Sequence, residues 1–174
     1  MVEIICSGFG GQGMLLIGKF LAEAGMESGK HVSWLPSYGP EMRGGTANCN
    51  VKISDEEIAS PYCDQLDILF TLNDAAIDKF ESQLRPGGLL LVNSDLARPD
   101  RVYRDDIVVV KVPANETAAE IGNTRGTNIV MLGAMSEASP YFDKDYMRGA
   151  IDHYFAKKGK VNAKNAVCFD RGAE

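Results

Sequence analysis

The chain has 174 residues, 45% of them hydrophobic and 24% charged, which is enough to bury a sizeable core in one domain spanning residues 1–174. The net charge of −6, without a cluster of lysines and arginines, argues against a nucleic-acid-binding surface. No window approaches the ~18 apolar residues of a membrane span, and the start of the chain lacks the basic and apolar regions of a signal peptide, so we expect a cytoplasmic protein.

The first half of the chain predicts three strands and one helix. Residues 2–7 form an apolar run typical of a buried strand, and apolar residues then recur at helical spacing from Gly11 to about Gly29, a suitable C-terminal glycine. A second strand is expected at 31–35. Residues 46–53 alternate strictly between apolar and polar side chains, which predicts a half-buried strand that is antiparallel to a neighbour.

The second half predicts a strand at 66–72, a helix capped by Asn73 that runs through Leu84, and two fully buried parallel strands at 89–92 and 107–112. Further helices are expected at 115–121, at 127–138 with Thr127 or Asn128 as the cap, after Asp143, and after Asn162. Strands that alternate with helices predict an α/β domain with three αβα layers and a mostly parallel, Rossmann-like sheet plus an antiparallel strand.

A glycine-rich loop joins the first strand to the first helix with the spacing Gly8-x-Gly10-x-x-Gly13 of the dinucleotide-binding motif. The amides and the dipole of a helix N-terminus attract a phosphate or a carboxylate. NAD would further require an acid at the end of the second strand, where the sequence is Trp34-Leu35-Pro36-Ser37. The glycines alternatively serve close packing of the helix on the strand, or close approach of a partner chain. The candidate anion contacts in this loop are Gly8, Gly10, Gly11, Gln12 and Gly13.

A second constrained loop, Pro36–Thr46, separates the second and third strands. Its prolines fix φ and its glycines permit unusual backbone angles, which indicates a loop that holds a defined shape for docking. Arg43 is suited to a bidentate contact with a carboxylate or phosphate, or to an ion pair with Glu41. Tyr38 either stacks on a ligand or packs the loop. The candidate interface residues are Ser37, Tyr38, Glu41, Arg43, Gly44 and Thr46.

No complete catalytic constellation is present in the sequence. The four cysteines, Cys6, Cys49, Cys63 and Cys168, are far apart, so we expect buried thiols rather than a locally formed metal or iron–sulfur site. No Ser or Cys stands beside a recognisable base, and we assign no catalytic residue and no metal ligand. The chain is therefore either a binding module or a subunit that completes an active site whose chemistry lies in other polypeptides.

The two loops together resemble the γ subunit of 2-oxoacid:ferredoxin oxidoreductases. The resemblance covers nearly the whole chain, and the form of the second loop is most similar to the 2-oxoglutarate and branched-chain 2-oxoacid members. The matching segments are Gly8-Phe9-Gly10-Gly11-Gln12-Gly13, Leu35–Asn48, Ile53-Ser54-Asp55, Pro86-Gly87-Gly88 and Asn128–Gly133.

This resemblance implies the fold of the γ domain of pyruvate:ferredoxin oxidoreductase, within an enzyme that oxidatively decarboxylates a 2-oxoacid to its acyl-CoA and reduces ferredoxin. In that family thiamine diphosphate and Mg²⁺ lie between the α and β subunits, and the iron–sulfur clusters are carried elsewhere, generally on a small ferredoxin-like δ subunit or domain and on the thiamine-binding part. We therefore expect the isolated chain to bind none of these cofactors and to be inactive. Its expected partners are the α, β and δ subunits and ferredoxin, with a homodimer when these are absent.

The resemblance leaves two roles open for the loops. Either the glycine loop and Arg43 hold the phosphates of coenzyme A, or both loops are only subunit contacts. A different class, a stand-alone nucleotide-binding Rossmann-like protein, is the alternative function.

Overall fold

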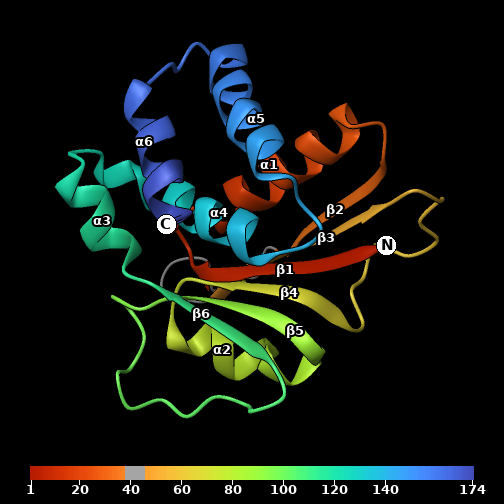
Figure 1. The fold of residues 1–174 in the computed structure, drawn as a ribbon. Helices are drawn as coiled ribbons and strands as arrows, with labels where there is room; N and C mark the ends of the chain where they lie inside the picture. Colours follow the sequence, from red (N-terminus) through yellow and green to blue (C-terminus); the bar gives the residue numbers. More distant parts are fainter. Residues whose placement is uncertain (38–45) are drawn as a thin grey trace. The chain divides into compact units, whose positions relative to one another are not determined.

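A computed structural model of the chain describes residues 1–37 and 46–174 (Figure 1). These residues form two compact units. Unit 1 comprises Met1–Val92 and Leu96–Val109, and unit 2 comprises Asn93–Asp95 and Val110–Glu174. Each unit is considered by itself below.

A six-stranded mixed sheet organises the strands of the chain. Strands β1 and β4 pair in parallel, as do β4 and β5, whereas β3 is antiparallel to both of its neighbours, β1 and β2. The predicted α/β fold with a Rossmann-like sheet and an antiparallel strand is therefore confirmed. In spatial order the strands are β2 (His31–Ser37), β3 (Thr46–Ser54), β1 (Val2–Phe9), β4 (Leu66–Thr71), β5 (Leu84–Asn93) and β6 (Val108–Val112).

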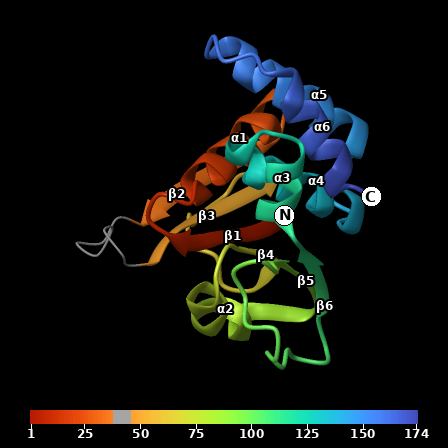
Figure 2. The same cartoon turned by 90° about the vertical axis from the view of Figure 1, so that its left-hand side faces the viewer.

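Helices cover both faces of the sheet within unit 1, which gives the three predicted layers. Helix α1 (Met14–Glu27) lies on one face, and α2 (Asp74–Phe80) lies on the other (Figures 1 and 2). Gly18 lets α1 approach the sheet closely, because a Cβ at this position would overlap the sulfur of Cys49. The cluster beneath α2 is entirely apolar. Its members are Ile5, Cys63, Leu66, Leu69, Ile77, Phe80, Leu84, Leu90 and Val92.

Strand β3 is buried on both faces, so the expectation of a half-buried strand is wrong. Its apolar residues pack under α1, as the alternation predicts, but Asn48 and Lys52 on the polar face are also only 6% exposed. The segment that follows β3 contacts this face, where the backbone N–H of Cys63 donates to Asn50 Oδ1 at 3.0 Å. Alternation identified the strand and its direction, but it could not reveal that a connecting segment covers the polar side.

One element boundary in unit 1 and the burial of the last strand differ from the predictions. Helix α2 ends at Phe80 and is followed by a single 3₁₀ turn, η1 (Glu81–Gln83), so that Leu84 begins β5 instead of ending the helix. Strand β6 is not fully buried, because it is the last strand of the sheet and Val108 is 51% exposed. An apolar run alone does not separate a central strand from an edge strand.

Unit 2 consists mainly of helices. Asp143 and Asn162 cap α5 and α6 as predicted, because their side chains accept from the N–H groups of Tyr146 and Lys164. The predicted cap of α4 is wrong: Gly126 precedes this helix, and no side-chain cap bond forms at its start. The helices are α3 (Ala114–Glu120), the 3₁₀ turn η2 (Thr124–Gly126), α4 (Thr127–Ala138), α5 (Lys144–Lys157) and α6 (Ala163–Gly172).

Helices α4 and α6 pack with their backbones in close contact. A Cβ on Gly133 would overlap the carbonyl oxygen of Phe169, and a Cβ on Gly172 would overlap that of Val130. Among the helices of residues 1–37 and 46–174, none has the length and apolar character needed to cross a membrane.

Candidate functional site

The glycine loop connects the carboxyl end of β1 to the N-terminus of α1. Gly11 and Gly13 have φ angles of 89° and 83°, a region that strains any residue with a Cβ. No side chain caps α1, and its first turn contains no acid. The first-turn N–H groups and the positive end of the helix dipole therefore form an environment suited to an anion.

Gln12 holds this loop in place through three hydrogen bonds. Its Oε1 accepts from the N–H of Phe9 at 2.6 Å and from Asn73 Nδ2 at 3.0 Å, while its Nε2 donates to the carbonyl oxygen of Leu72 at 3.4 Å. Asn73 in turn caps α2, because its Oδ1 accepts from the N–H of Ala76 at 2.9 Å. The side chain of Gln12 therefore joins the glycine loop to the carboxyl end of β4, a positioning role that the motif alone did not indicate.

The glycines of the loop differ in their surroundings. Gly8 is buried, and a Cβ there would lie 2.7 Å from both Gln12 Oε1 and Met14 Cε, so its small size serves close packing. Gly11 is exposed, with nothing within 4 Å of the position of a Cβ. Gly10 and Gly13 are partly exposed. The accessible part of the candidate anion site is therefore Gly10 to Gly13.

The two loops predicted to be functional start from the same edge of the sheet. Phe9, the last residue of β1, pairs with Thr46, the first residue of β3, and Ser37 at the end of β2 pairs with Asn48. The Thr46 end of the second loop therefore lies beside the glycine loop, and strand β3 separates its Ser37 end from β1. The remaining residues proposed there, Tyr38, Glu41, Arg43 and Gly44, lie outside the described residues.

Two apolar side chains that the sequence analysis missed flank the glycine loop. Phe9 is 40% exposed and Leu16 is 39% exposed. Each is unremarkable alone. Phe9 precedes the loop in the sequence and Leu16 follows it in α1, so exposed apolar side chains occur next to the candidate anion site.

The topology argues against the dinucleotide interpretation independently of the missing acid. In a dinucleotide-binding unit the second strand lies next to the first and carries the ribose-binding acid. Here β3 is inserted between β1 and β2. Two strand spacings of ~4.8 Å put the end of β2 about 10 Å from β1, twice the usual separation.

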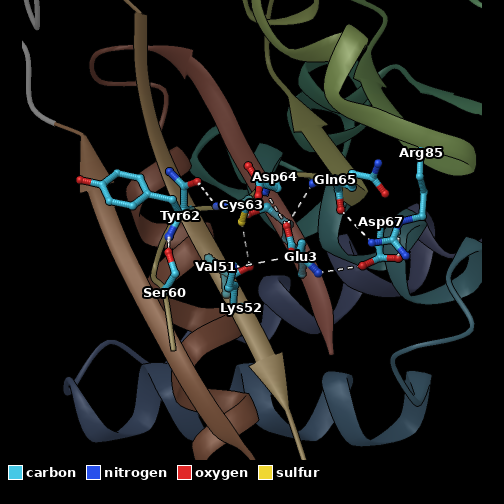
Figure 3. Close-up of polar contacts among 12 residues, drawn as sticks. Glu3, Val51, Lys52, Ser60, Tyr62, Cys63, Asp64, Gln65, Asp67 and Arg85 are labelled. Carbon is cyan, nitrogen blue, oxygen red and sulfur yellow. Dashed lines mark hydrogen bonds and ion pairs between the residues drawn. The ribbon is translucent and has the colours of Figure 1, made fainter. Parts of the chain in front are cut away.

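A second polar cluster lies at the amino end of β1 (Figure 3). Glu3 Oε2 accepts from the N–H groups of Asp64 and Gln65 at 2.7 and 3.3 Å, and Lys52 Nζ lies 3.6 Å from Glu3 Oε1. The N–H of Glu3 donates to Asp67 Oδ2 at 2.8 Å. These contacts tie the segment before β4 to β1 and β3, so we interpret the cluster as a structural anchor for this segment.

The four cysteines are all free and buried, as expected. Within the part of the chain that the structure describes, no group of three or more His, Cys, Asp or Glu side chains is arranged to hold a metal ion. The described residues thus define an α/β domain whose distinguishing feature is a rigid glycine loop, with no donor set of its own for an iron–sulfur cluster.

The sequence of the chain matches a known protein family along almost its whole length. The family model for pyruvate ferredoxin/flavodoxin oxidoreductase matches residues 3–174. The chain therefore belongs to the pyruvate ferredoxin/flavodoxin oxidoreductase family, which confirms the resemblance seen in the sequence.

Individual relatives are subunits of enzymes that act on 2-oxoacids. The 2-oxoglutarate synthase subunit KorC of Methanocaldococcus jannaschii is 38% identical over 174 residues, which cover 99% of this chain and 92% of that protein. The ketoisovalerate oxidoreductase subunit VorA of Methanothermobacter marburgensis is 39% identical, but the chain spans only 36% of its length.

Solved structures agree with this fold. A keto/oxoacid ferredoxin oxidoreductase γ subunit from Geobacter sulfurreducens has a TM-score of 0.78 at 32% identity and covers 99% of this chain and 96% of that one. A 2-oxoglutarate:ferredoxin oxidoreductase from Magnetococcus marinus, solved with 2-oxoglutarate, coenzyme A and succinyl-CoA bound, has a TM-score of 0.83 at 28% identity, with coverage of 98% of this chain and 30% of that one.

Proposed function

We propose that residues 1–174 act as one γ-type domain, the γ subunit of a cytoplasmic 2-oxoacid:ferredoxin oxidoreductase. The complex would convert a 2-oxoacid and coenzyme A into an acyl-CoA and CO₂ while reducing ferredoxin. The observation that carries this proposal is the 38% identity to KorC along almost the full length of both chains. The favoured substrates are 2-oxoglutarate or a branched-chain 2-oxoacid, the types named for KorC and VorA.

The chain's lack of a catalytic constellation fits a division of labour among subunits. Thiamine diphosphate, Mg²⁺ and the iron–sulfur clusters would be held by α, β and δ partners, since the described residues offer no metal-binding group. The thiamine cofactor would supply the decarboxylation chemistry. This chain would supply a rigid glycine loop at the subunit boundary, fixed by Gln12 and Asn73.

The experiment is reconstitution with candidate α, β and δ subunits from the same organism. The complete complex is expected to reduce ferredoxin with one of 2-oxoglutarate, 3-methyl-2-oxobutanoate or pyruvate in a coenzyme A-dependent reaction. The chain alone, and the complex prepared without it, are the two controls and should be inactive or strongly impaired. Full activity of the complex without this chain would overturn the proposal.

Within this function, we propose that the glycine loop and Arg43 contact the phosphates of coenzyme A. Support comes from the uncapped N-terminus of α1 and from the open space beside Gly11. Gly11→Asp adds a negative charge and strain at a left-handed position, and Arg43→Ala removes a cation. Each should raise the KM for coenzyme A about tenfold or more, as expected when a charge-assisted contact is lost, with a much smaller effect on the KM for the 2-oxoacid.

The competing role for the same residues is subunit contact alone. It predicts that Arg43→Ala and Gly11→Asp dissociate the complex on a sizing column, while any intact enzyme keeps its normal KM for coenzyme A. Gly29→Ala is a matched control, because Gly29 is also left-handed at φ 81° but lies at the other end of α1. It should leave both the assembly and the KM unchanged.

The alternative of a stand-alone nucleotide-binding protein has a direct test. Titration of the isolated chain with NADH, monitored by the fluorescence of Trp34, should give no saturable signal. Saturable binding in the micromolar range would favour that alternative over the γ-subunit role.

A further inference from the structure

Cys6 and Cys49 are directly opposite each other on the antiparallel strands β1 and β3. Both side chains are completely buried. Directly opposed residues of antiparallel strands have Cα atoms ~4.5–5.5 Å apart. This spacing lies within the ~4.4–6.8 Å range of disulfides. A bond between the two sulfurs would therefore fit without displacement of either strand.

The two thiols are chemically unequal. The thiol of Cys6, the backbone N–H groups of Cys6 and Gly18, and the indole N–H of Trp34 surround the sulfur of Cys49 and lower its pKa. Trp34 Nε1 is buried and has no hydrogen-bond partner. The neighbouring Cys49 thiol, together with burial, raises the pKa of Cys6. Cys49 is therefore the thiol of the pair that ionises more readily, and thiolates are the reactive form of cysteine.

The thiol of Cys49 lies beneath the first turns of α1, where it donates a hydrogen bond to the carbonyl oxygen of Met14 at 3.5 Å and lies next to Gly18. These turns follow the glycine loop and have no side-chain cap. Helix ends without caps open locally at low cost. Such opening gives a small oxidant a route to the sulfur while the sheet stays intact.

We propose that Cys6 and Cys49 form an oxidisable dithiol that reacts with hydrogen peroxide and closes to a disulfide beside the glycine loop. The Cys49 thiolate attacks one peroxide oxygen, the O–O bond breaks, and the second oxygen leaves as hydroxide, which a proton converts to water. The Cys6 sulfur then attacks the Cys49 sulfenic acid, the S–O bond breaks, and the S–S bond forms as a second water leaves. Two thiols lose two electrons and their protons, and one peroxide gains them. A dithiol reductant reverses the reaction by exchange.

The other two cysteines serve as internal controls. Cys63 donates to the carbonyl oxygens of Ile4 and Val51, and burial raises its pKa to about 12. Burial also raises the pKa of Cys168. Both should stay as thiols at peroxide doses that consume the Cys6–Cys49 pair.

The test treats the reduced full-length chain with graded hydrogen peroxide, then alkylates it with N-ethylmaleimide and maps the peptides without reduction. Cys6 and Cys49 should be lost from the alkylated pool together, at least about tenfold faster than Cys63 and Cys168, and appear as one cross-linked peptide that dithiothreitol releases. The same treatment of the assembled complex reports whether the pair also closes there. The proposal is overturned if all four thiols of the chain remain alkylatable, or if the cross-link joins any other pair.

Two variants test the order of the steps. In Cys6→Ser, Cys49 should accumulate as a sulfenic acid that dimedone traps. In Cys49→Ser, Cys6 should stay alkylatable at the same dose. Equal oxidation of Cys6 in the presence and absence of Cys49 would contradict the assignment of Cys49 as the attacking thiolate. The wild-type peptide map decides the cross-link itself if either variant fails to fold.

Discussion

Asn73 Nδ2 donates a hydrogen bond to Gln12 Oε1 at 3.0 Å and so connects the glycine loop with the cap of a second helix. The two residues stand at the carboxyl ends of the parallel strands β1 and β4, next to each other in the sheet. One amide side chain therefore fixes the loop conformation that the proposed function requires. Mutation can test this relationship. The amide of Gln12 both accepts and donates hydrogen bonds, and different substitutions remove one role or both.

Gln12→Ala should lower the free energy of unfolding by about 1–2 kcal/mol, because the N–H of Phe9 and the amide of Asn73 both lose their acceptor. Gln12→Glu keeps the acceptor oxygen and should cost less. Urea unfolding followed by circular dichroism measures both. Gln83→Ala, in the 3₁₀ turn η1, is the control and should stay within about 0.5 kcal/mol of the wild type. Equal stability of Gln12→Ala, Gln12→Glu and Gln83→Ala would contradict the positioning role of Gln12.

Lys52→Met should destabilise the protein by about 3–5 kcal/mol, because it leaves the buried carboxylate of Glu3 without its cation. The double variant with Glu3→Gln should recover much of this loss, since the amide oxygen still accepts from the segment before β4. The matched control is Lys30→Met, which removes an exposed ion pair with Asp55 and should lower the stability far less than Lys52→Met does. A similar loss of stability in Lys52→Met and Lys30→Met would mean that the Glu3–Lys52 pair is effectively solvated.

Cys63 should make stability fall at alkaline pH. Burial raises the pKa of its thiol to about 12, whereas an unfolded cysteine ionises near ~8.5. The stabilisation is therefore complete below pH ~8.5 and is lost as the pH rises toward 12, by up to ~1.4 kcal/mol per pH unit. The stability advantage of the wild type over Cys63→Ala should shrink by up to about 2 kcal/mol between pH 7 and 10.

This comparison needs a reductant throughout and unfolding curves at several pH values. Between pH 6 and 7 the two proteins should respond identically, which provides the baseline. If the difference in the free energy of unfolding between the wild type and Cys63→Ala stays constant up to pH 10, Cys63 ionises in the folded protein as readily as in the unfolded one.

Gly133→Ala should destabilise unit 2 by about 1–3 kcal/mol or more, since the added methyl group meets the backbone of Phe169 and cannot be accommodated by a change of rotamer. Gly149→Ala is the opposite control. Gly149 is exposed within α5, with nothing within 4 Å of a Cβ, and alanine there should stabilise the helix by about 0.5–1 kcal/mol. Thermal unfolding should therefore shift in opposite directions for two identical substitutions. A shift in the same direction would contradict the close contact between α4 and α6.

Local patterns in the sequence determined much of the fold. Alternation in residues 46–53 predicted the antiparallel strand. The caps Asn73, Asp143 and Asn162 predicted three helix starts, because capping depends on a few neighbouring residues. The glycine spacing marked the loop after β1, and the residues of the second loop indicated the family. Asn73 and the glycine loop could therefore both be recognised from the sequence, but only as separate local features.

Only the tertiary structure decided which distant residues meet. The alternation in the sequence predicts a solvated face for Lys52, whereas strand pairing buries this lysine against Glu3. Cys6 and Cys49 are far apart in the sequence, whereas strand pairing places them opposite each other. The insertion of β3 between β1 and β2 likewise separates a glycine motif from the position where a dinucleotide would need its acid. Strand order and register are set by the combined packing of the whole sheet, which no local pattern of residues contains.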